Sequence, residues 1–282
     1  SNFEASSRHL ISLLCQVLFD PRTVPEGRSN ISAVLLRFLS SSSDDAATFV
    51  RNETMRSFTD VINERGGSSR SGEAGGSVQQ RRKAGRKRRR KEIEGVSDDG
   101  LFHLARHWSA QDVAAVGPVL SAISAQGIFW EIASDAVKTS IQKLCQNLSA
   151  SKARRRPGSV GLVAHCLAGG LAHGSGSIVG IDVNTFHTKT IQVLSEISKG
   201  SDNEAKAVVP ALLCFVENYM KLRKQTYPAS ELGSLVQSCS SLVDSSTSGR
   251  GGLQACYSVH LAHAVASLLS VLGSCIAPNC PA

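Results

Sequence analysis

The chain has 282 residues and a formal net charge of +8, a length that allows about two domain-sized units with a sizeable core. Hydrophobic residues make up 41% of the sequence but aromatic residues only 5%, so the core must consist mainly of Leu, Val, Ile and Ala. This composition argues against an aromatic-rich β-sandwich or barrel. A charged fraction of 19%, together with long apolar runs, argues against a fully disordered chain.

Residues 4–64 are predicted to form three helices. The first is expected to end at Asp20-Pro21, and the second before the serine run 40–43. The third is expected to begin at Asp44-Asp45, where acidic groups favour a helix N-terminus, and to end at Gly66-Gly67. The apolar spacing predicts one buried face for each helix. In the first helix this face carries Leu10, Leu13, Leu14, Val17 and Leu18, and in the second it carries Ile31, Val34, Leu35, Phe38 and Leu39. In the third helix it carries Phe49, Met55, Phe58, Val61 and Ile62.

Residues 66–98 lose all hydrophobic periodicity, and Gly, Ser and Arg dominate there. This predicts a disordered or partner-bound linker between N-terminal helices at 1–65 and a helical repeat region at 99–282. The linker holds nine cations within eleven residues, and the rest of the chain then has a net charge of −1. We call these nine the basic tract: Arg81, Arg82, Lys83, Arg86, Lys87, Arg88, Arg89, Arg90 and Lys91.

Helical periodicity resumes at Leu101. Ser109-Ala110-Gln111-Asp112 has the pattern of a capping box, in which the Ser hydroxyl caps a backbone N–H and the acidic group faces the helix dipole. The helix that follows is expected to end near Gly127, and another to begin near Ser134. Their predicted buried positions are Val113, Val116, Val119, Leu120 and Ile123 in the former, and Val137, Ile141, Leu144 and Leu148 in the latter.

This helix–turn–helix unit recurs along the chain. Similar segments begin at residues 116, 163 and 209, which are 47 and 46 residues apart. Segments of the second helix, 140–144 and 190–194, are 50 residues apart, and Val236-Gln237 follows Ile191-Gln192 by 45. Two helices in a period of about 45–50 residues are typical of HEAT and armadillo proteins. We therefore predict an all-α fold, an irregular α-solenoid of stacked helix pairs. The N-terminal helices fit one further pair once the linker is removed.

The stretch 105–116, leading into 120–127, resembles a recurring pattern in organellar RNA-associated helical repeats. These are the repeats of the Fas-activated serine/threonine kinase-like, RAP-associated, heptatricopeptide and octotricopeptide types. In them a polar start leads into a helix of small residues and a turn that ends in Gly. The polar start in this chain is Ser109 with Asp112-Val113-Ala114. The likeness extends over 109–148 and more weakly over 158–198 and 203–242, and no RAP domain is found. It implies an α-solenoid that binds RNA or supports a ribonucleoprotein in mitochondria or plastids, and it assigns no nucleotide-reading residue.

The basic tract is the strongest functional signal. Its cations can contact several phosphates, which gives salt-dependent, sequence-independent binding, and its many arginines favour bidentate phosphate contacts. No aromatic residue interrupts the tract, so base stacking is not supported. The alternative is a nuclear localisation signal or a solvated tract. Smaller basic groups at predicted connections could extend a phosphate-binding surface or simply be solubilising charges: Lys152, Arg154, Arg155 and Arg156, and Lys221, Arg223 and Lys224.

Other candidate sites are weaker. His103 and His107 have a metal-binding spacing but lack the metalloprotease glutamate. Cys256, His260 and His263 with a later cysteine could bind zinc, but no paired short spacing supports this, so we expect no metal and no cofactor. The eight cysteines indicate buried thiols in a reducing compartment. Residues 259–277 carry no charge, but a His/Ser stripe favours a helix buried on most faces over a membrane span.

No Walker lysine or G-x-S-x-G motif is present, and we expect neither catalysis nor a small-molecule substrate. The sequence predicts a structural RNA-binding protein of a ribonucleoprotein, with rRNA and neighbouring proteins as partners and the mitochondrial ribosome as its expected place. Its expected nucleic-acid contacts are the basic tract, Arg154, Arg155 and Arg156. Two alternatives stay open: a HEAT/armadillo-like protein scaffold with a nuclear localisation signal, and a subunit of a membrane-associated complex.

Overall fold

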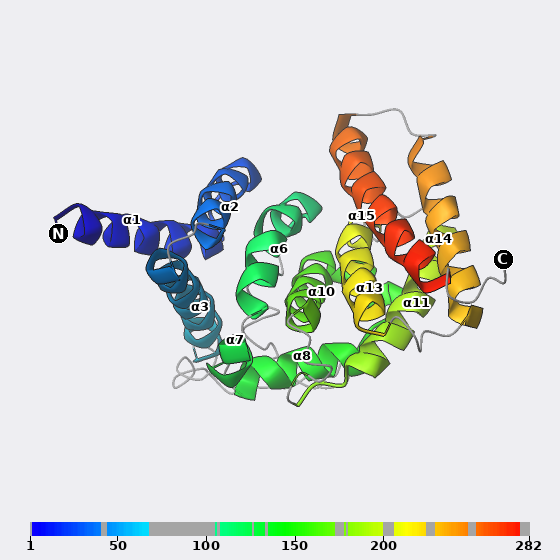
Figure 1. The fold of residues 1–282 in the computed structure, drawn as a ribbon, viewed down its shortest axis with the longest axis horizontal. Coiled ribbons are helices and arrows are strands. Elements are labelled where there is room, and N and C mark those ends of the chain that lie inside the picture. Colours follow the sequence, from blue (N-terminus) through cyan, green and yellow to red (C-terminus); the bar gives the residue numbers. More distant parts are fainter. Residues whose placement is uncertain are drawn as a thin grey trace, which may run out of the picture.

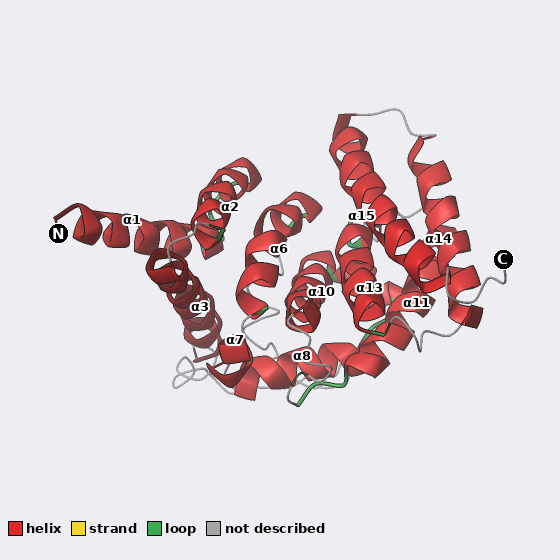
Figure 2. Ribbon diagram, viewed as in Figure 1, coloured by secondary structure: helices red, strands yellow, loops and turns green. Residues whose placement is uncertain are grey.

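The computed structural model describes residues 2–40, 44–67, 105, 108–125, 127–132, 135–172, 178, 180–199, 206–223, 229–247 and 252–276. All regular structure in these residues is α-helical apart from a single 3-10 position, and they contain no strand (Figure 2). The prediction of an all-α fold is therefore confirmed. The basic tract and the rest of the linker from residue 68 onward lie outside the described residues.

The helices stack as consecutive pairs in two layers (Figure 1). One layer is a continuous row in which each helix packs on the next: α2 (Pro25–Leu39), α6 (Ala110–Ser124), α10 (Pro157–Ala172), α13 (Val209–Leu222) and α15 (Gly252–Ile276). The other layer holds α3 (Asp44–Gly67), the short α7 (Gly127–Ile132), α8 (Asp135–Asn147), α11 (Val183–Lys199) and α14 (Ala229–Thr247). The predicted repeat segments at 116, 163 and 209 lie on α6, α10 and α13, successive members of the first row, and the stacked pairs are those of an α-solenoid.

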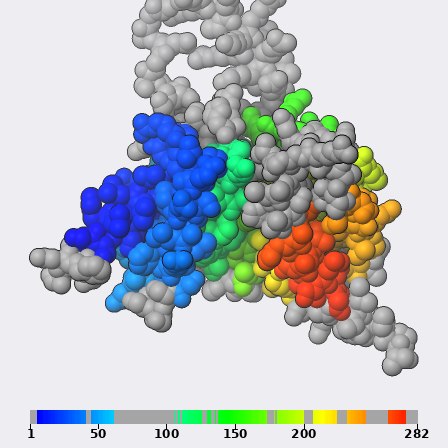
Figure 3. Space-filling view, turned by 90° about the horizontal axis from the view of Figure 1, so that it is seen from above, coloured from blue at the N-terminus to red at the C-terminus, as the bar shows by residue number. Residues whose placement is uncertain are grey.

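The N-terminal helices belong to the same stack. Helix α2 packs extensively on α6, although the linker separates them in sequence, and α1 (Asn2–Phe19) packs on α3 (Figure 3). Three aromatic side chains connect α1, α3 and α7. The ring centroids of Phe19 and Phe58 are 5.4 Å apart, and those of Phe58 and Phe129 are 6.4 Å apart. The linker is thus an insertion between α3 and α6 of one stack, and the fold is continuous across it.

The central helix α10 is buried on nearly every side because it is built from small residues. Gly158, Gly161 and Gly169 lie where α6 and the turn before it approach most closely. A Cβ atom added at Gly169 would be 2.2 Å from the Ser121 carbonyl oxygen, and one at Gly158 would be 2.4 Å from that of Ala105. Glycine is required at these contacts because any larger residue would push the two helices apart.

Two predicted helix faces match the structure completely. Helix α6 buries Val113, Val116, Val119, Leu120 and Ile123, and α8 with the residue after it buries Val137, Ile141, Leu144 and Leu148. The capping box is also confirmed, since the Asp112 backbone N–H donates to the Ser109 hydroxyl and the Ser109 N–H donates to the Asp112 carboxylate.

Two other predictions of buried faces fail at least in part. In α1 the predicted Leu18 is buried and Leu14 is half-buried, but the predicted Leu10, Leu13 and Val17 are 57%, 44% and 43% exposed. The helix buries Ile11, Cys15 and Phe19 in their place. Both sides of α1 are apolar, and packing on α3 selects the side that carries Cys15. Over its described side chains, residues 261–273, helix α15 is buried on one side only: Leu261, Val265, Leu268 and Leu272 face the stack, while Leu269 and Ser270 are exposed. It is the last helix of its row, so nothing in the described chain covers its outer side.

Candidate nucleic-acid interface

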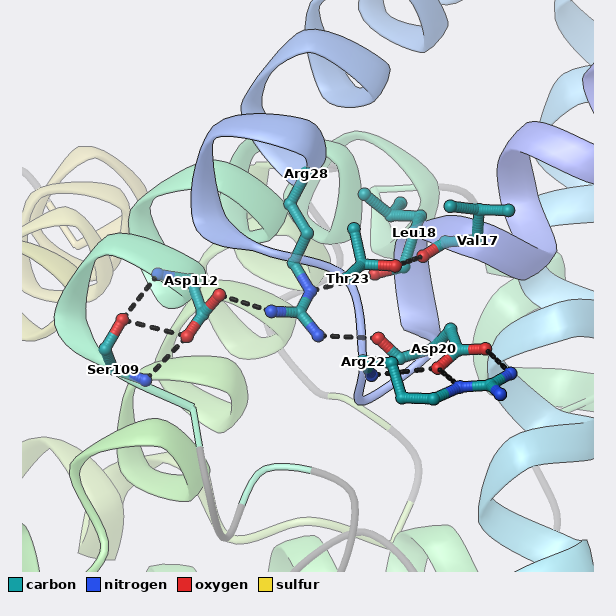
Figure 4. A network of polar contacts seen from close by, with 8 residues as sticks. All are labelled: Val17, Leu18, Asp20, Arg22, Thr23, Arg28, Ser109 and Asp112. Atoms are coloured by element: carbon teal, nitrogen blue, oxygen red, sulfur yellow. Dashed lines mark hydrogen bonds and ion pairs between the residues drawn. The ribbon is translucent and has the colours of Figure 1, made fainter.

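A buried polar contact holds the start of α2 against the start of α6, the helix that follows the insertion (Figure 4). Arg28 donates to the Asp112 carboxylate, to the Leu18 carbonyl oxygen over 3.2 Å and to the Asp20 carbonyl oxygen over 2.7 Å. Its guanidinium carbon also lies 5.3 Å from the centre of the Trp108 ring. The side chains of Arg28 and Asp112 are only 3% and 7% exposed, so this ion pair is shielded from water.

The contact between Arg28 and Asp112 stabilises the packing of α2 on α6. Three guanidinium nitrogens of Arg28 are engaged by oxygen acceptors, and the Asp112 carboxylate also closes the capping box with Ser109. A buried ion pair with its hydrogen bonds satisfied specifies the fit between two elements and leaves no group to react. The pair therefore fixes α2 against α6 on either side of the segment that carries the basic tract.

The basic group predicted at residues 152–156 lies in the described part of the fold. Its residues are placed by α9 (Ala150–Arg155), a short helix in a region predicted to be a connection. The Ser149 hydroxyl caps α9 by accepting from the Lys152 N–H over 3.3 Å, and Ala150 and Ala153 are buried. The buried alanine face leaves the other positions outward, and the helix stops at Arg156 because Pro157 follows. Arg154 and Arg155 are exposed and Arg156 is half-buried.

Helix α9 packs on α11, which brings a further cation to this place. Burial lowers the pKa of Lys152, and the positive charges of Arg156 and Lys189 lower it further. Lys189 comes from α11, 33 residues after Arg156, and its place in the cluster could not be predicted because only the stacking of α9 on α11 sets it. We call Lys152, Arg154, Arg155, Arg156 and Lys189 the α9 corner.

The third basic group is engaged within the fold. Lys221 makes an ion pair with Glu217 one turn away over 2.5 Å. Arg223 donates to the Asn184 side-chain oxygen over 3.3 Å and lies 5.8 Å from the centre of the Tyr219 ring. Lys224 lies outside the described residues. Lys221 and Arg223 therefore already have partners within the fold.

The buried histidines and cysteines are unsuited to nucleophilic or acid–base chemistry. Burial lowers the pKa of His165 and of His187 to about 4, so both are neutral near pH 7. The neutral His187 ring stacks on Tyr219 at 4.0 Å, and its contact with Glu231 at 3.9 Å is consequently not an ion pair. Burial also raises the thiol pKa values to about 11 or 12, which leaves the thiolate unpopulated at neutral pH: Cys15, Cys145, Cys166, Cys214 and Cys239.

The remaining candidate sites give no constellation in the part of the chain that is described. No group of three or more His, Cys, Asp or Glu side chains there could hold a metal ion. His103, His107 and Cys280 are outside the described residues, as are the side chains of Cys256, His260 and Cys275, and His263 is exposed. Among the helices searched, including the described part of 259–277, none is both long and apolar enough to cross a membrane.

Comparison with known proteins adds no relative: no family model, no curated protein and no solved structure matches the chain. The charges and the fold of this chain are therefore the observations that bear on its function.

Proposed function

We propose that the chain is a non-catalytic RNA-binding structural protein of a ribonucleoprotein. The observation that carries this proposal is the basic tract, which concentrates nine cations within eleven residues of a chain that is otherwise close to neutral. Dense Lys and Arg charge binds nucleic acid by releasing counterions from phosphates, and it needs no base-specific contact.

The fold supports a scaffolding role for the rest of the molecule. Stacked helix pairs offer an extended surface on which neighbouring proteins and RNA can be arranged. Because α2 packs on α6, the helices before and after the insertion belong to one continuous body. The α9 corner offers a second group of cations on that body.

The most specific form of the proposal is a subunit of an organellar ribosome, with the basic tract on rRNA phosphates and helix surfaces on neighbouring proteins. It is supported by the resemblance of residues 109–148 to organellar RNA-associated repeats. That resemblance also favours mitochondria over the nucleus.

The test is the affinity of the full chain for RNA, measured by fluorescence anisotropy with a short labelled double-stranded RNA over a range of KCl concentrations. A protein that contacts six or more phosphates is expected to lose about a thousandfold or more in affinity between 50 and 200 mM salt. A variant with all nine tract cations changed to Gln should lose most of the affinity and most of the salt dependence. Salt-independent binding, or equal binding by the variant, would contradict the proposal.

A second candidate function is a protein–protein scaffold of HEAT/armadillo type whose basic tract is a nuclear localisation signal. The observation that favours it is the exposed apolar side of α1, with Leu10, Leu13 and Val17. In that case the tract variant would move from one compartment to another in cells but would still purify with the same protein partners. Loss of the partners together with RNA would favour the ribonucleoprotein.

A further inference from the structure

We infer that helices α1, α2 and α3 form a separate cooperative unit, which opens away from α6 and loosens while the rest of the solenoid stays folded. We call these three helices the N-terminal unit, and the contact between α2 and α6 the joint. This movement is a property of the fold and does not depend on the proposed function.

The N-terminal unit has contacts of its own that do not involve α6. The buried rings of Phe19 in α1 and Phe58 in α3 are 5.4 Å apart between centroids. The Cys15 sulfur of α1 lies 3.3 Å from the Thr54 hydroxyl of α3, and both side chains are buried. These contacts hold the unit together from inside. A unit of this size, residues 2–67, is only marginally stable by itself, so its helices are expected to loosen once it leaves α6.

The face that α2 turns toward α6 is mostly polar. Of the 15 residues of α2, only Arg28, Ser32 and Leu35 are buried, and their spacing of four and three residues places them on one side of the helix. Arg28 shows that this side meets α6, because its guanidinium reaches Asp112 there (Figure 4). The other apolar residues of α2 are half-buried or exposed. The joint therefore has little fully buried apolar surface on the α2 side.

Closing the joint also has a cost in polar groups. The Ser32 hydroxyl and the Trp108 indole N–H are buried without a hydrogen-bond partner among the described residues, and the Trp108 ring centre lies 5.3 Å from the Arg28 guanidinium carbon. In the open state water can bond to both groups. Water then also hydrates the charges of Arg28 and Asp112, whose attraction in the closed state is largely offset by their desolvation. Opening consequently costs less free energy here than at an apolar contact of the same size.

The next two contacts along the row, of α6 with α10 and of α10 with α13, are more apolar. Helix α10 buries 13 of its 16 residues, and only Ser159 among the 13 is polar. A Cβ atom added at Gly169 would be 2.2 Å from the Ser121 carbonyl oxygen, which shows how closely α10 approaches α6. The buried residues of α13 are all apolar. Because each helix pair in a solenoid is held mainly by its neighbours, we expect the joint to open before these two contacts.

Hydrogen exchange of the full chain at low urea, read by mass spectrometry, tests this movement. Relative to their intrinsic rates, peptides of α1, α2 and α3 should exchange at least about tenfold faster than those of α10 and α13. Arg28→Met should speed exchange in all three helices of the unit by at least about tenfold more, because opening hydrates the Asp112 carboxylate that the variant leaves buried without its cation. Exchange in α10 and α13 should not change.

Helix α3 distinguishes opening of the whole unit from a local defect around Arg28. None of the hydrogen bonds described for Arg28 reaches α3, which contacts the second layer through Phe58 and Phe129. Faster exchange in α3 is therefore expected only if the three helices move together. The matched control is Arg22→Met, which removes a cation whose side chain is 88% exposed and should leave exchange unchanged in every helix.

Thiol labelling of the full chain is an independent measurement. Cys15 of α1 and Cys166 of α10 are both 0% exposed, so each reacts only when its surroundings open. Cys15 should react at least about tenfold faster than Cys166, and Arg28→Met should accelerate Cys15 alone. Equal protection of the unit and of α10 in the unmodified chain would overturn the inference, and this comparison is decisive even if Arg28→Met does not fold. Acceleration confined to peptides around residues 28 and 112, or equal in α3 and α10, would also overturn it.

Discussion

Arg28 connects three segments of the chain through one side chain, since it bonds the end of α1, the turn after it and the start of α6. We expect Arg28→Met to lower the free energy of unfolding by about 3–5 kcal/mol, because it leaves the Asp112 carboxylate buried without its cation. Chemical denaturation measures this loss.

The matched control for that variant is Arg22→Met. Arg22 also pairs with an aspartate, Asp20, over 2.7 Å, but its side chain is 88% exposed, so the unfolding midpoint should barely change. The double variant Arg28→Met/Asp112→Asn should lose less than the sum of the single losses, since it removes both charges. An Arg28→Met protein as stable as Arg22→Met would contradict the structural role of the pair.

The buried histidines give the molecule a pH-dependent stability. In the unfolded chain His165 and His187 take up protons near their ordinary pKa of 6.5, whereas burial lowers the folded pKa of each to about 4. The unfolded state therefore binds more protons between pH 6.5 and 4, and folding stability must fall as the pH falls through that window. Above pH 6.5 these two groups contribute no pH dependence.

Urea unfolding at pH 7 and pH 5 measures this effect. We expect each histidine to cost up to about 1.4 kcal/mol per pH unit below pH 6.5. His187→Gln should reduce the difference between the two pH values, whereas His263→Gln, at an exposed position of α15, should leave it as in the unmodified protein. A pH difference that is unaffected by replacing both His165 and His187 would show that other groups cause it.

At the scale of the elements, the close packing of α10 on α6 depends on Gly169. We expect Gly169→Ala to destabilise the fold by about 1–3 kcal/mol, although alanine is the better helix former, because the new methyl group would meet the backbone of Ser121. Thermal unfolding measures the change.

Gly233→Ala in α14 is the matched control for this variant. No atom lies within 4 Å of the position that its Cβ would occupy, so only helix propensity applies, and the protein should be unchanged or gain up to about 1 kcal/mol. Equal effects of the two substitutions would show that α10 and α6 are not in the close contact described.

Whether the buried face of a helix could be predicted from the sequence depended on the pattern of its apolar residues. The faces of α6 and α8 could be predicted because their large apolar residues lie on one side only. The face of α1 could not, because Leu10, Leu13 and Val17 form as good a stripe as the residues that are buried, and only packing on α3 decides between them. The short helices α7 and α9 lack a long periodic pattern and were predicted as connections.

Contacts between distant residues were beyond sequence reasoning for a physical reason. The Arg28–Asp112 pair joins positions 84 residues apart, and neither residue type signals burial by itself. Lys189 similarly joins the α9 corner only because α11 stacks beside α9. The residues of the corner that follow one another in the chain, Arg154 to Arg156, were predicted as a basic group from sequence, and their location on a helix was not.

At the scale of the whole molecule, the net charge of +8 divides between a nearly neutral solenoid and one short insertion. The insertion begins after α3, and the stack resumes at α6, with α2 and α6 packed together as neighbours. Binding to RNA phosphates and maintenance of the fold are therefore expected to be separable properties. A variant that lacks the nine charges should keep the stability of the solenoid, because no described core contact involves them.

The most direct measurement of the central claim is sedimentation of the protein from gently lysed cells, compared between the unmodified chain and the variant with the nine tract cations changed to Gln. We expect the unmodified chain to sediment with large ribonucleoprotein particles at low salt and to be released at high salt or by ribonuclease. The variant should stay near the top of the gradient while folding normally. An equally fast-sedimenting variant, or particles that keep the chain after ribonuclease treatment, would contradict the claim that the tract attaches this protein to RNA.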